Sequence, residues 1–418
     1  MLTSSALVLM MTLPGLALFY AGLVRAKNSL SLFMQCLASA GIAGVLWVLV
    51  GYSLAFDTGN AFIGGLGKVG LQGITPDSLS GTIPEYVFVM FQAMFAIITP
   101  ALMIGAFAER MRFGPFVAFI TLWLLLVYCP LAHMVWGGGY LAEIGALDFA
   151  GGLVVHMSSG FSALVAALYL GKRRGFGRDP MPPHNLPFTV LGAALLWVGW
   201  FGFNAGSALA ANGVAALAFI TTSTAASAAL LVWLAIEWLH RGKPTVLGAA
   251  TAAVAGLVAV TPACAFITPL GALAVGAGVS VLSYAAVTLL KPALGYDDSL
   301  DVFGVHGIGG AWGALATGLF LADFALVDGV SRGAQIWIQT KSIVFTAIFA
   351  PLATLAILFL LRALFGSLRA DDEAEFVGLD LAEHSESAYE FGTASGTATG
   401  HMMAVSPAPV PVPATAKV

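Results

Sequence analysis

Long apolar runs, separated by short polar connections, fill this chain almost to its end. A helix of about 20 apolar residues can span the hydrocarbon core of a bilayer, and most of these runs have that length. The pattern therefore predicts an all-α integral membrane protein with eleven transmembrane helices. We place them at residues 2–24, 29–56, 86–108, 113–135, 149–170, 187–205, 212–239, 245–266, 268–290, 300–321 and 338–365.

Composition supports the same class. The 418 residues are 59% hydrophobic and 9% charged, and the mean hydropathy is +0.93. A soluble domain carries about 25% charged residues, so this chain lacks the polar surface it would need in water. A net charge of −4 without a basic tract gives no argument for nucleic-acid binding. Three cysteines in or beside separate apolar runs fit buried side chains better than disulfides or a metal site: Cys36, Cys129 and Cys264.

The basic residues set the predicted orientation. All but three of the 17 Lys and Arg residues lie on alternate connections, at the end of the eleventh helix or in the tail. The exceptions are Lys68, Arg332 and Lys341. Positive charge marks the cytoplasmic side, so we expect the N-terminus outside and the C-terminus in the cytoplasm. The first run has no charged segment before it and no small-residue cleavage site, which favours a retained helix.

Five predicted helices precede the connection at 171–186, and five follow it before the eleventh. A repeat with an odd number of helices must be inverted in the membrane, as in many transport folds. His156 and His306 then lie on the fifth helix of each half and approach the middle from opposite faces. At 1.5 Å per residue they lie about 12 Å past Asp148 and about 8 Å past Asp301. The two histidines can meet only if the tenth helix begins below the membrane surface. We include this condition in the hypothesis that they form a pair.

The two histidines have related surroundings, LDFAGGLVVH (147–156) and LDVFGVH (300–306). A titratable side chain within a membrane is costly and usually serves a pathway. A lone buried histidine can instead lock two helices by a hydrogen bond. The paired settings and the nearby glycines favour a shared pore: Gly151, Gly152, Gly304 and Gly307. No third ligand stands in obvious partnership with the pair, so a zinc site is disfavoured.

Asp148 and Asp301 open the fifth and tenth predicted helices. A carboxylate at a helix start accepts hydrogen bonds from free backbone N–H groups, and we expect both residues to act as such caps. Direct binding of a cation by Asp148 is the alternative. That arrangement would hold a cation too tightly for fast passage.

Aromatic residues gather near the predicted outer face. Phe91 and Phe95 are four residues apart and share a helix face. Trp136 follows the fourth helix, and the sixth ends in an aromatic, glycine-rich stretch at 197–207. Interfacial belts and core packing explain many membrane aromatics. This glycine-rich setting favours an aromatic cage, which attracts a small cation through ring faces.

The sequence resembles the ammonium transporter family, the Amt/Mep/Rh group, over nearly its whole length up to about residue 390. The bacterial branch is the more similar one. The stretches that carry the resemblance are PGLALFYAGLVR (14–25), AHMVWGGG (132–139), LDFAGGLVVH (147–156), GWFGFNAGS (199–207) and DVFGVHG (301–307).

The resemblance implies a homotrimer of eleven-helix protomers in the bacterial inner membrane, each with its own hydrophobic pore and without a cofactor. It implies an outer ammonium recruitment site formed by Phe91, Trp136 and Ser207. Phe95 and Phe203 would be the stacked rings of a gate. His156 and His306 would be the twin-histidine pair that lines the pore. Asp148 would have a mainly structural role near the recruitment site.

Ammonium is close in size to potassium, so the pore must distinguish them chemically. Moving either intact cation into a nonpolar pore costs about several kcal/mol or more. Ammonium alone can give up a proton and continue as ammonia. The residues leave open whether transport is electrogenic or a net flux of ammonia. Resemblance to the bacterial branch favours electrogenic transport.

Three regions are expected: a transmembrane domain (1–366), a cytoplasmic regulatory C-terminal region (367–390) and a disordered tail (391–418). The acidic segment from Arg369 to Asp380 resembles the family's C-terminal region, which contacts neighbouring protomers and PII-type signal proteins. The tail departs from the family pattern and is rich in Ala, Thr, Pro and Val.

Two other functions are compatible with parts of the sequence. An ammonium-sensing receptor with little flux would be expected to carry a signalling module, and the short tail shows none. An intramembrane enzyme would need a nucleophile or a metal beside the histidines, where Ser158 and Ser159 are the nearby hydroxyls. The sequence therefore favours a transporter and not an enzyme.

Overall fold

A computed structural model describes residues 1–389, and the predicted tail at 391–418 lies outside them. The described chain is mainly helical. Its two-stranded antiparallel sheet pairs β1 (Leu79–Ser80) with β2 (Ile83–Pro84) in a polar connection. The prediction of an all-α membrane fold is confirmed at this level.

Five long helical segments precede residue 171, and several contain a short π-helical turn. They are α1–η1–α2 (Leu2–Met10, Met11–Leu16, Ala17–Leu23), α3–η3–α4 (Ser29–Leu46, Trp47–Gly51, Tyr52–Phe56), α5–α6 (Glu85–Leu102, Ile104–Phe107), α7–η5–α8 (Phe113–Trp123, Leu124–Tyr128, Cys129–Trp136) and η6–α10 (Gly152–Met157, Ser158–Leu170).

Six further segments follow a connection at 171–185. They are α11–η7 (Leu186–Asn204, Ala205–Ala208), α12 (Gly213–Arg241), α13 (Val246–Val260), α14–η8–α15 (Pro269–Ala285, Ala286–Leu290, Lys291–Leu294), η9–α16 (Phe303–Gly307, Ile308–Leu319) and α17 (Arg332–Phe365). The short elements are η2 (Ala26–Asn28), η4 (Val69–Leu71), α9 (Tyr140–Glu143), η10 (Asp323–Ala325), α18 (Asp372–Val377) and α19 (Leu379–His384).

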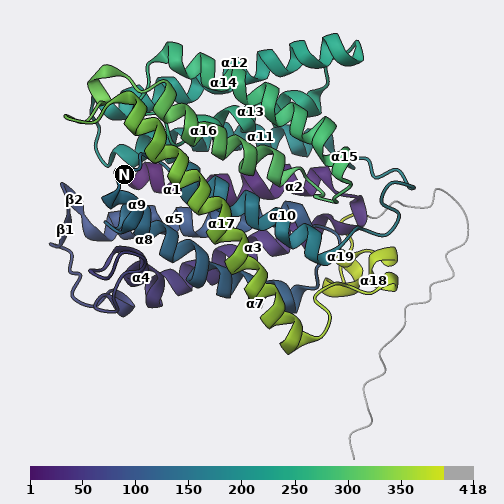
Figure 1. Ribbon diagram of the computed structural model, residues 1–418. Helices are drawn as coiled ribbons and strands as arrows, with labels where there is room; N and C mark the ends of the chain where they lie inside the picture. Colours follow the sequence, from purple (N-terminus) through teal and green to yellow (C-terminus); the bar gives the residue numbers. More distant parts are fainter. Residues whose placement is uncertain (390–418) are drawn as a thin grey trace, which may run out of the picture. The chain divides into compact units, whose positions relative to one another are not determined.

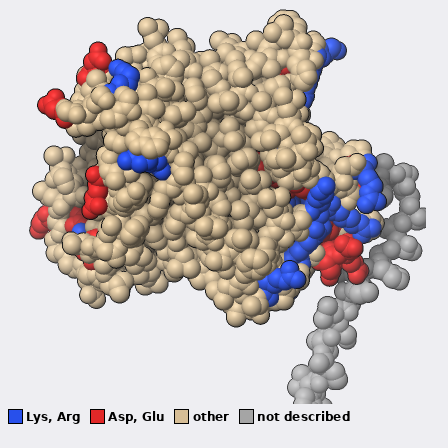
Figure 2. Space-filling view, in the orientation of Figure 1, with Lys and Arg blue, Asp and Glu red and all other residues tan. Residues whose placement is uncertain are grey.

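Nine helical segments within residues 1–389 are long and apolar enough to cross a membrane. The two other predicted spans correspond to the shorter helices α13 and η9–α16. The most buried segments are Glu85–Phe107 and Gly152–Leu170, with 78% and 72% of their most apolar stretch buried. Elements from the first half of the chain gather on one side of the bundle, and α12, α13, α14 and α16 gather on the other (Figure 1). Charged side chains lie at the two ends, with a broad uncharged band between (Figure 2).

Backbones of the two halves approach each other closely beside the histidines. A Cβ added at Gly160 would overlap the backbone of Gly307. A Cβ at Gly310 would lie 2.9 Å from the carbonyl oxygen of Gly152 and 3.1 Å from the His156 Cβ. Small residues let membrane helices pack backbone to backbone. The crossing therefore fixes the separation of the two histidine-bearing helices.

Buried ion pairs join several connections at one end of the bundle. Arg25 and Arg173 contact the Glu109 carboxylate at 2.9 and 3.0 Å, and Arg173 also contacts Asp297 at 2.8 Å. Burial opposes ionisation of Glu109, but the guanidinium groups of Arg173 and Arg25 hold its pKa below the ordinary value. The connections after the first, third, fifth and ninth predicted helices therefore share one end, as the charge pattern predicts.

The C-terminal region supplies caps for two long helices at the same end. The Asp380 carboxylate accepts hydrogen bonds from the N–H groups of Leu30 and Ser31, at 3.0 and 2.7 Å. Glu383 accepts one from the Phe113 N–H at 3.1 Å. The residues just before α3 and α7 make no side-chain cap of their own. This region is therefore an integral part of the helix ends.

We expect Gly160→Ala to lower the melting temperature of the detergent-solubilised protein by several degrees. The added methyl group must separate two backbones, and overpacking typically costs about 1–3 kcal/mol. The matched control is Gly41→Ala, whose Cβ would meet no atom within 4 Å. It should leave the melting temperature unchanged or raise it slightly. Equal melting temperatures for Gly160→Ala and wild type would contradict the close crossing.

Asp380→Ala should speed amide hydrogen exchange at Leu30 and Ser31, because their N–H groups lose a buried acceptor. Loss of a helix cap costs about 1 kcal/mol. Exposed Glu373 lies on the same region and provides the control Glu373→Ala, which should leave exchange at α3 unchanged. Unaltered exchange in both variants would show that α3 does not depend on this cap.

Candidate functional site

The two predicted pore histidines lie against each other in the bundle centre. The Nδ1 atoms of His156 and His306 are 3.2 Å apart, and the rings lie nearly parallel with centroids 5.3 Å apart. Both side chains are buried. At this distance one Nδ1 carries the proton and donates it to the other. The structure thus brings together residues separated by 150 positions in the chain.

Each histidine lies in a single π-helical turn at the start of its helix. His156 is in η6 and His306 is in η9. A π turn inserts one extra residue, which redirects the side chains, and such turns are common at functional sites. Gly151 precedes η6 with φ 116°, a conformation that a residue with a Cβ rarely adopts. Periodicity alone did not reveal these turns.

Asp148 caps the helix that carries His156. Its carboxylate accepts hydrogen bonds from four backbone N–H groups, those of Gly151, Gly152, Leu153 and Val154, at 2.5–3.2 Å. Its own carbonyl oxygen accepts the Trp136 indole N–H at 2.9 Å. Both carboxylate oxygens are therefore engaged by the helix start, as the capping hypothesis expects.

The expected cap at Asp301 is wrong, because Asp298 takes that position. The Asp298 carboxylate accepts the Phe303 N–H at 2.7 Å and is buried. Asp301 has φ 60° and directs its carboxylate to the Lys291 ammonium at 2.6 Å. Asp298 precedes His306 by eight residues, the same spacing that separates Asp148 from His156. Because Asp297, Asp298 and Asp301 lie within five positions, the sequence alone did not show which of them corresponds to Asp148.

Burial of this connection also explains how the histidines meet. Asp297 and Asp298 are buried, and Asp297 belongs to the ion-pair cluster of Glu109 and Arg173. The helix that carries His306 therefore begins below the surface of the bundle, as the hypothesis requires. Burial raises the pKa of the Asp298 carboxyl to about 6.

Aromatic rings lead from one end of the bundle to the histidines. The Phe95 ring contacts Phe91 and Trp136 edge to face, with centroids 5.0 and 5.8 Å away. The Phe95 and Phe203 rings are 4.3 Å apart, and Phe203 lies 6.1 Å from the His156 ring. Phe91, Phe95 and Phe203 are buried. The predicted recruitment and gate aromatics thus form one continuous column.

Ser207 lies one turn beyond Phe203, in η7. Its hydroxyl donates to the Phe203 carbonyl oxygen at 2.8 Å. A hydroxyl oxygen that donates its proton this way still has lone pairs that can accept a hydrogen bond.

Trp200 is a site residue that the sequence interpretation did not single out. Its ring stacks on His156 with centroids 5.4 Å apart, and its indole N–H donates to Thr261 at 2.9 Å. The sequence feature that could have identified Trp200 as a site residue is its position three residues before Phe203.

Two cavities adjoin the histidine pair. One has a volume of about 10 Å³ and is lined by both histidines, Trp200, Phe203 and apolar side chains. That volume holds about one water-sized molecule. The other cavity has a volume of about 570 Å³. It reaches His306 from the end of the bundle that holds the connection with Asp297 and Asp298, and Tyr20 and Asp301 form part of its lining. Within residues 1–389, no group of three His, Cys, Asp or Glu residues could hold a metal ion.

This arrangement leaves room for about one small molecule beside the pair and can hold or move a proton at imidazole nitrogen. Bulk ions would lose their water in the narrow apolar segment. The chemistry therefore combines an aromatic entrance, a constriction and a relay of two imidazoles.

Comparison with known proteins identifies the fold. The family model described as Ammonium Transporter Family matches residues 1–389. An ammonium transporter of Bacillus subtilis is 50% identical over 392 residues, covering 92% of this chain and 96% of the relative. Among solved structures, Saccharomyces cerevisiae Mep2 has a TM-score of 0.84 at 36% identity, with 94% and 91% of the two chains covered. A structure titled "Sensor Amt Protein" has a TM-score of 0.86 at 29% identity, with coverage of 91% and 96%.

The match to the family model and the coverage of these relatives agree with the fold. On this combined evidence, the chain belongs to the ammonium transporter family.

Proposed function

We propose that this protein moves ammonium across the membrane, with the proton and ammonia separating before the narrow segment. The observation that carries this proposal is the contact between two buried imidazoles at the end of an aromatic column. Family membership supplies the substrate class. The geometry supplies a route that favours a species able to lose its charge.

Recruitment takes place at Phe91, Trp136 and Ser207. Ring faces of Phe91 and Trp136 attract a cation through their quadrupoles, an interaction of about 0.5–2 kcal/mol. The Ser207 oxygen accepts one N–H hydrogen bond. Asp148 contributes through position, because its carbonyl fixes the Trp136 indole and its carboxylate fixes the helix of His156.

Phe95 and Phe203 form the gate. With centroids 4.3 Å apart, their rings are packed together, and Phe203 lies against the His156 ring. In this proposal, rotation of these rings opens the way for each transfer. The gate also limits water beside the pair, which raises the cost for any hydrated ion.

The histidine pair separates ammonium from potassium. A single shared proton between the Nδ1 atoms leaves one Nε2 as a donor and the other as an acceptor. Ammonia can accept from the first and donate to the second as it passes. Potassium can do neither and cannot shed its charge, so it stays excluded. Movement of the separated proton along the imidazoles makes transport electrogenic.

The wider assembly follows the family pattern. We place eleven helices in the membrane as an inverted five-helix repeat plus α17, with the N-terminus outside and the C-terminus in the cytoplasm. The protein forms a homotrimer in the bacterial inner membrane. Residues 367–390 form the regulatory region, which a PII-type signal protein can contact at the cytoplasmic face.

A receptor that binds ammonium with little flux is the second candidate. The observation that favours it is the similarity to a structure whose title calls that protein a sensor. The open 570 Å³ cavity beyond His306 favours passage over simple binding, because a receptor needs no exit.

Replacement of both histidines should abolish selective transport. We expect His156→Ala/His306→Ala to reduce the ammonium-evoked current of proteoliposomes by about a hundredfold, the lower range for a positioned proton-transfer group. Potassium pulses should evoke no current in the wild type. If the variant instead conducts both ions, the pair acts as the selectivity element, which also supports the proposal.

His240→Gln is the matched control, since this histidine bonds to the Tyr284 hydroxyl and itself lines neither cavity beside the pair. It should keep most of the wild-type current, and melting temperatures should confirm that all variants fold. Internal alkalinisation without current in the wild type would indicate a net flux of ammonia. Ammonium binding without current or alkalinisation would favour the receptor.

Asp298 provides a pH test of its capping position. Because its pKa of about 6 is above the ordinary value, ionisation between pH 4 and 7 costs native-state free energy. The melting temperature of the wild type should therefore fall, relative to that of Asp298→Asn, as the pH rises through this range. Asp301→Asn should retain the wild-type trend, because Asp298 still titrates. A trend abolished by Asp301→Asn alone would contradict the assignment.

A further inference from the structure

A polar cavity of about 410 Å³ lies where α10 and α17 end. Its walls are Tyr169 and Leu170 at the end of α10, Arg362 in the last turn of α17, and the connection at 366–369. The lining is distinct from that of the cavities beside the histidines. This cavity therefore needs an explanation apart from the transport pathway.

One of the two guanidinium groups that line the cavity, that of Arg362, is not neutralised by a described residue. Arg369 pairs with Glu375 at 2.5 Å and donates to the Leu170 carbonyl oxygen at 3.1 Å. Arg362 is exposed, and its guanidinium has no hydrogen bond or ion pair with another described residue. Arg112, also exposed, donates to the Ser367 carbonyl oxygen at 3.4 Å. A band of basic side chains begins at this end of α17 (Figure 2).

The helix dipoles of α10 and α17 balance only part of this positive charge. Both helices direct carbonyl ends toward the cavity, and each end carries about half a negative charge. Arg369 offsets the end of α10 through the Leu170 carbonyl. The guanidinium of Arg362 remains at the end of α17, and Arg112 lies outside the lining but contacts the wall at Ser367.

Tyr169 adds a polar group in need of a partner. Its hydroxyl is buried and makes no hydrogen bond within residues 1–389. A buried donor without an acceptor costs about 1–3 kcal/mol. An oxygen-rich anion in the cavity would supply the acceptor and pair with Arg362.

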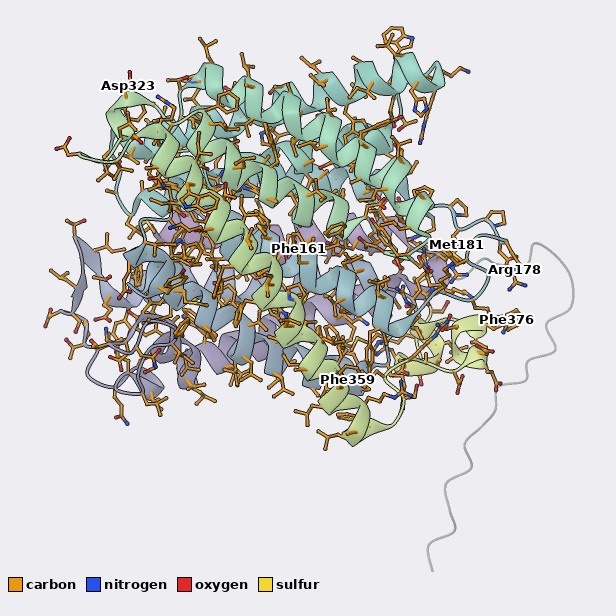
Figure 3. The ribbon with its side chains drawn as sticks, viewed as in Figure 1. Phe161, Arg178, Met181, Asp323, Phe359 and Phe376 are labelled. Atoms are coloured by element: carbon orange, nitrogen blue, oxygen red, sulfur yellow. The ribbon has the colours of Figure 1, made fainter. Side chains whose placement is uncertain are left out.

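The adjoining surface of α17 is apolar. Phe359, Leu360 and Phe365 are 58%, 48% and 42% exposed. Phe359 projects near the end of α17, as Figure 3 shows. A free anion gains nothing from such a face, whereas acyl chains of a lipid would lie along it. Basic cavities at helix ends are suited to acidic headgroups.

We propose that this cavity binds the phosphate headgroup of an acidic membrane phospholipid, with its acyl chains along the end of α17. Arg362 pairs with the phosphate and Tyr169 donates its hydroxyl proton to a phosphate oxygen. The site goes beyond the proposed transport function and does not depend on which species is transported. Because residues 366–369 form a wall, bound lipid also stabilises the connection to α18.

Native mass spectrometry of the full-length protein in detergent tests this site. Phosphatidylglycerol is titrated against wild type, Arg362→Gln and the control Arg178→Gln, which alters an exposed arginine in the connection between α10 and α11 (Figure 3). We expect binding to weaken about fivefold in Arg362→Gln, equivalent to about 1 kcal/mol for one basic side chain near an anionic surface. Arg178→Gln should match the wild type, and Arg362→Lys should retain more binding than Arg362→Gln.

Further arms separate the sources of phosphate. Phosphatidylcholine with the same acyl chains tests for a general lipid groove, and inorganic phosphate tests for a soluble anion. Preference for phosphatidylglycerol that depends on Arg362 supports the proposal. Equal binding by wild type and Arg362→Gln, equal binding of both lipids, or full competition by inorganic phosphate would overturn it. Melting temperatures without added lipid verify folding of each variant.

Discussion

The structure depends on one constraint: a backbone N–H group in a membrane has no water to bond. Two helices begin within the bundle so that their histidines meet, and each start would leave N–H groups without acceptors. Asp148 and Asp298 supply those acceptors from within each chain half. The histidine contact depends on these two buried helix starts. So do the positions of the aromatic column on one side of the pair and of the cavity on the other.

The same constraint explains the charged end of the bundle. Asp380 and Glu383 cap α3 and α7, and Glu109 and Asp297 hold Arg173 beside the connection that contains Asp298. A segment that looks like a polar tail in sequence is thus built into the ends of membrane helices. Its displacement would expose N–H groups of α3, so a partner that binds it acts directly on the bundle.

Sequence patterns predicted the membrane fold, the paired histidines and the aromatic column, because each depends on local composition or on related motifs. The position of Asp298 was missed, since Asp301 stands in the more obvious motif and only the backbone at φ 60° excludes it. Trp200 was missed because an aromatic near a helix end has many explanations. The π turns of η6 and η9 and the short helices α13 and η9–α16 depend on packing between distant segments, which periodicity does not encode.

The Gly160–Gly307 crossing limits how the histidine site can vary. With no side chain between the backbones, the two histidine-bearing helices are at their minimum separation. A side chain added at either glycine can only push the two backbones apart. Substitutions there therefore cannot bring the two imidazoles closer together. Side chains at the two ends of this route can therefore change while the separation of the two helices at its centre stays constant.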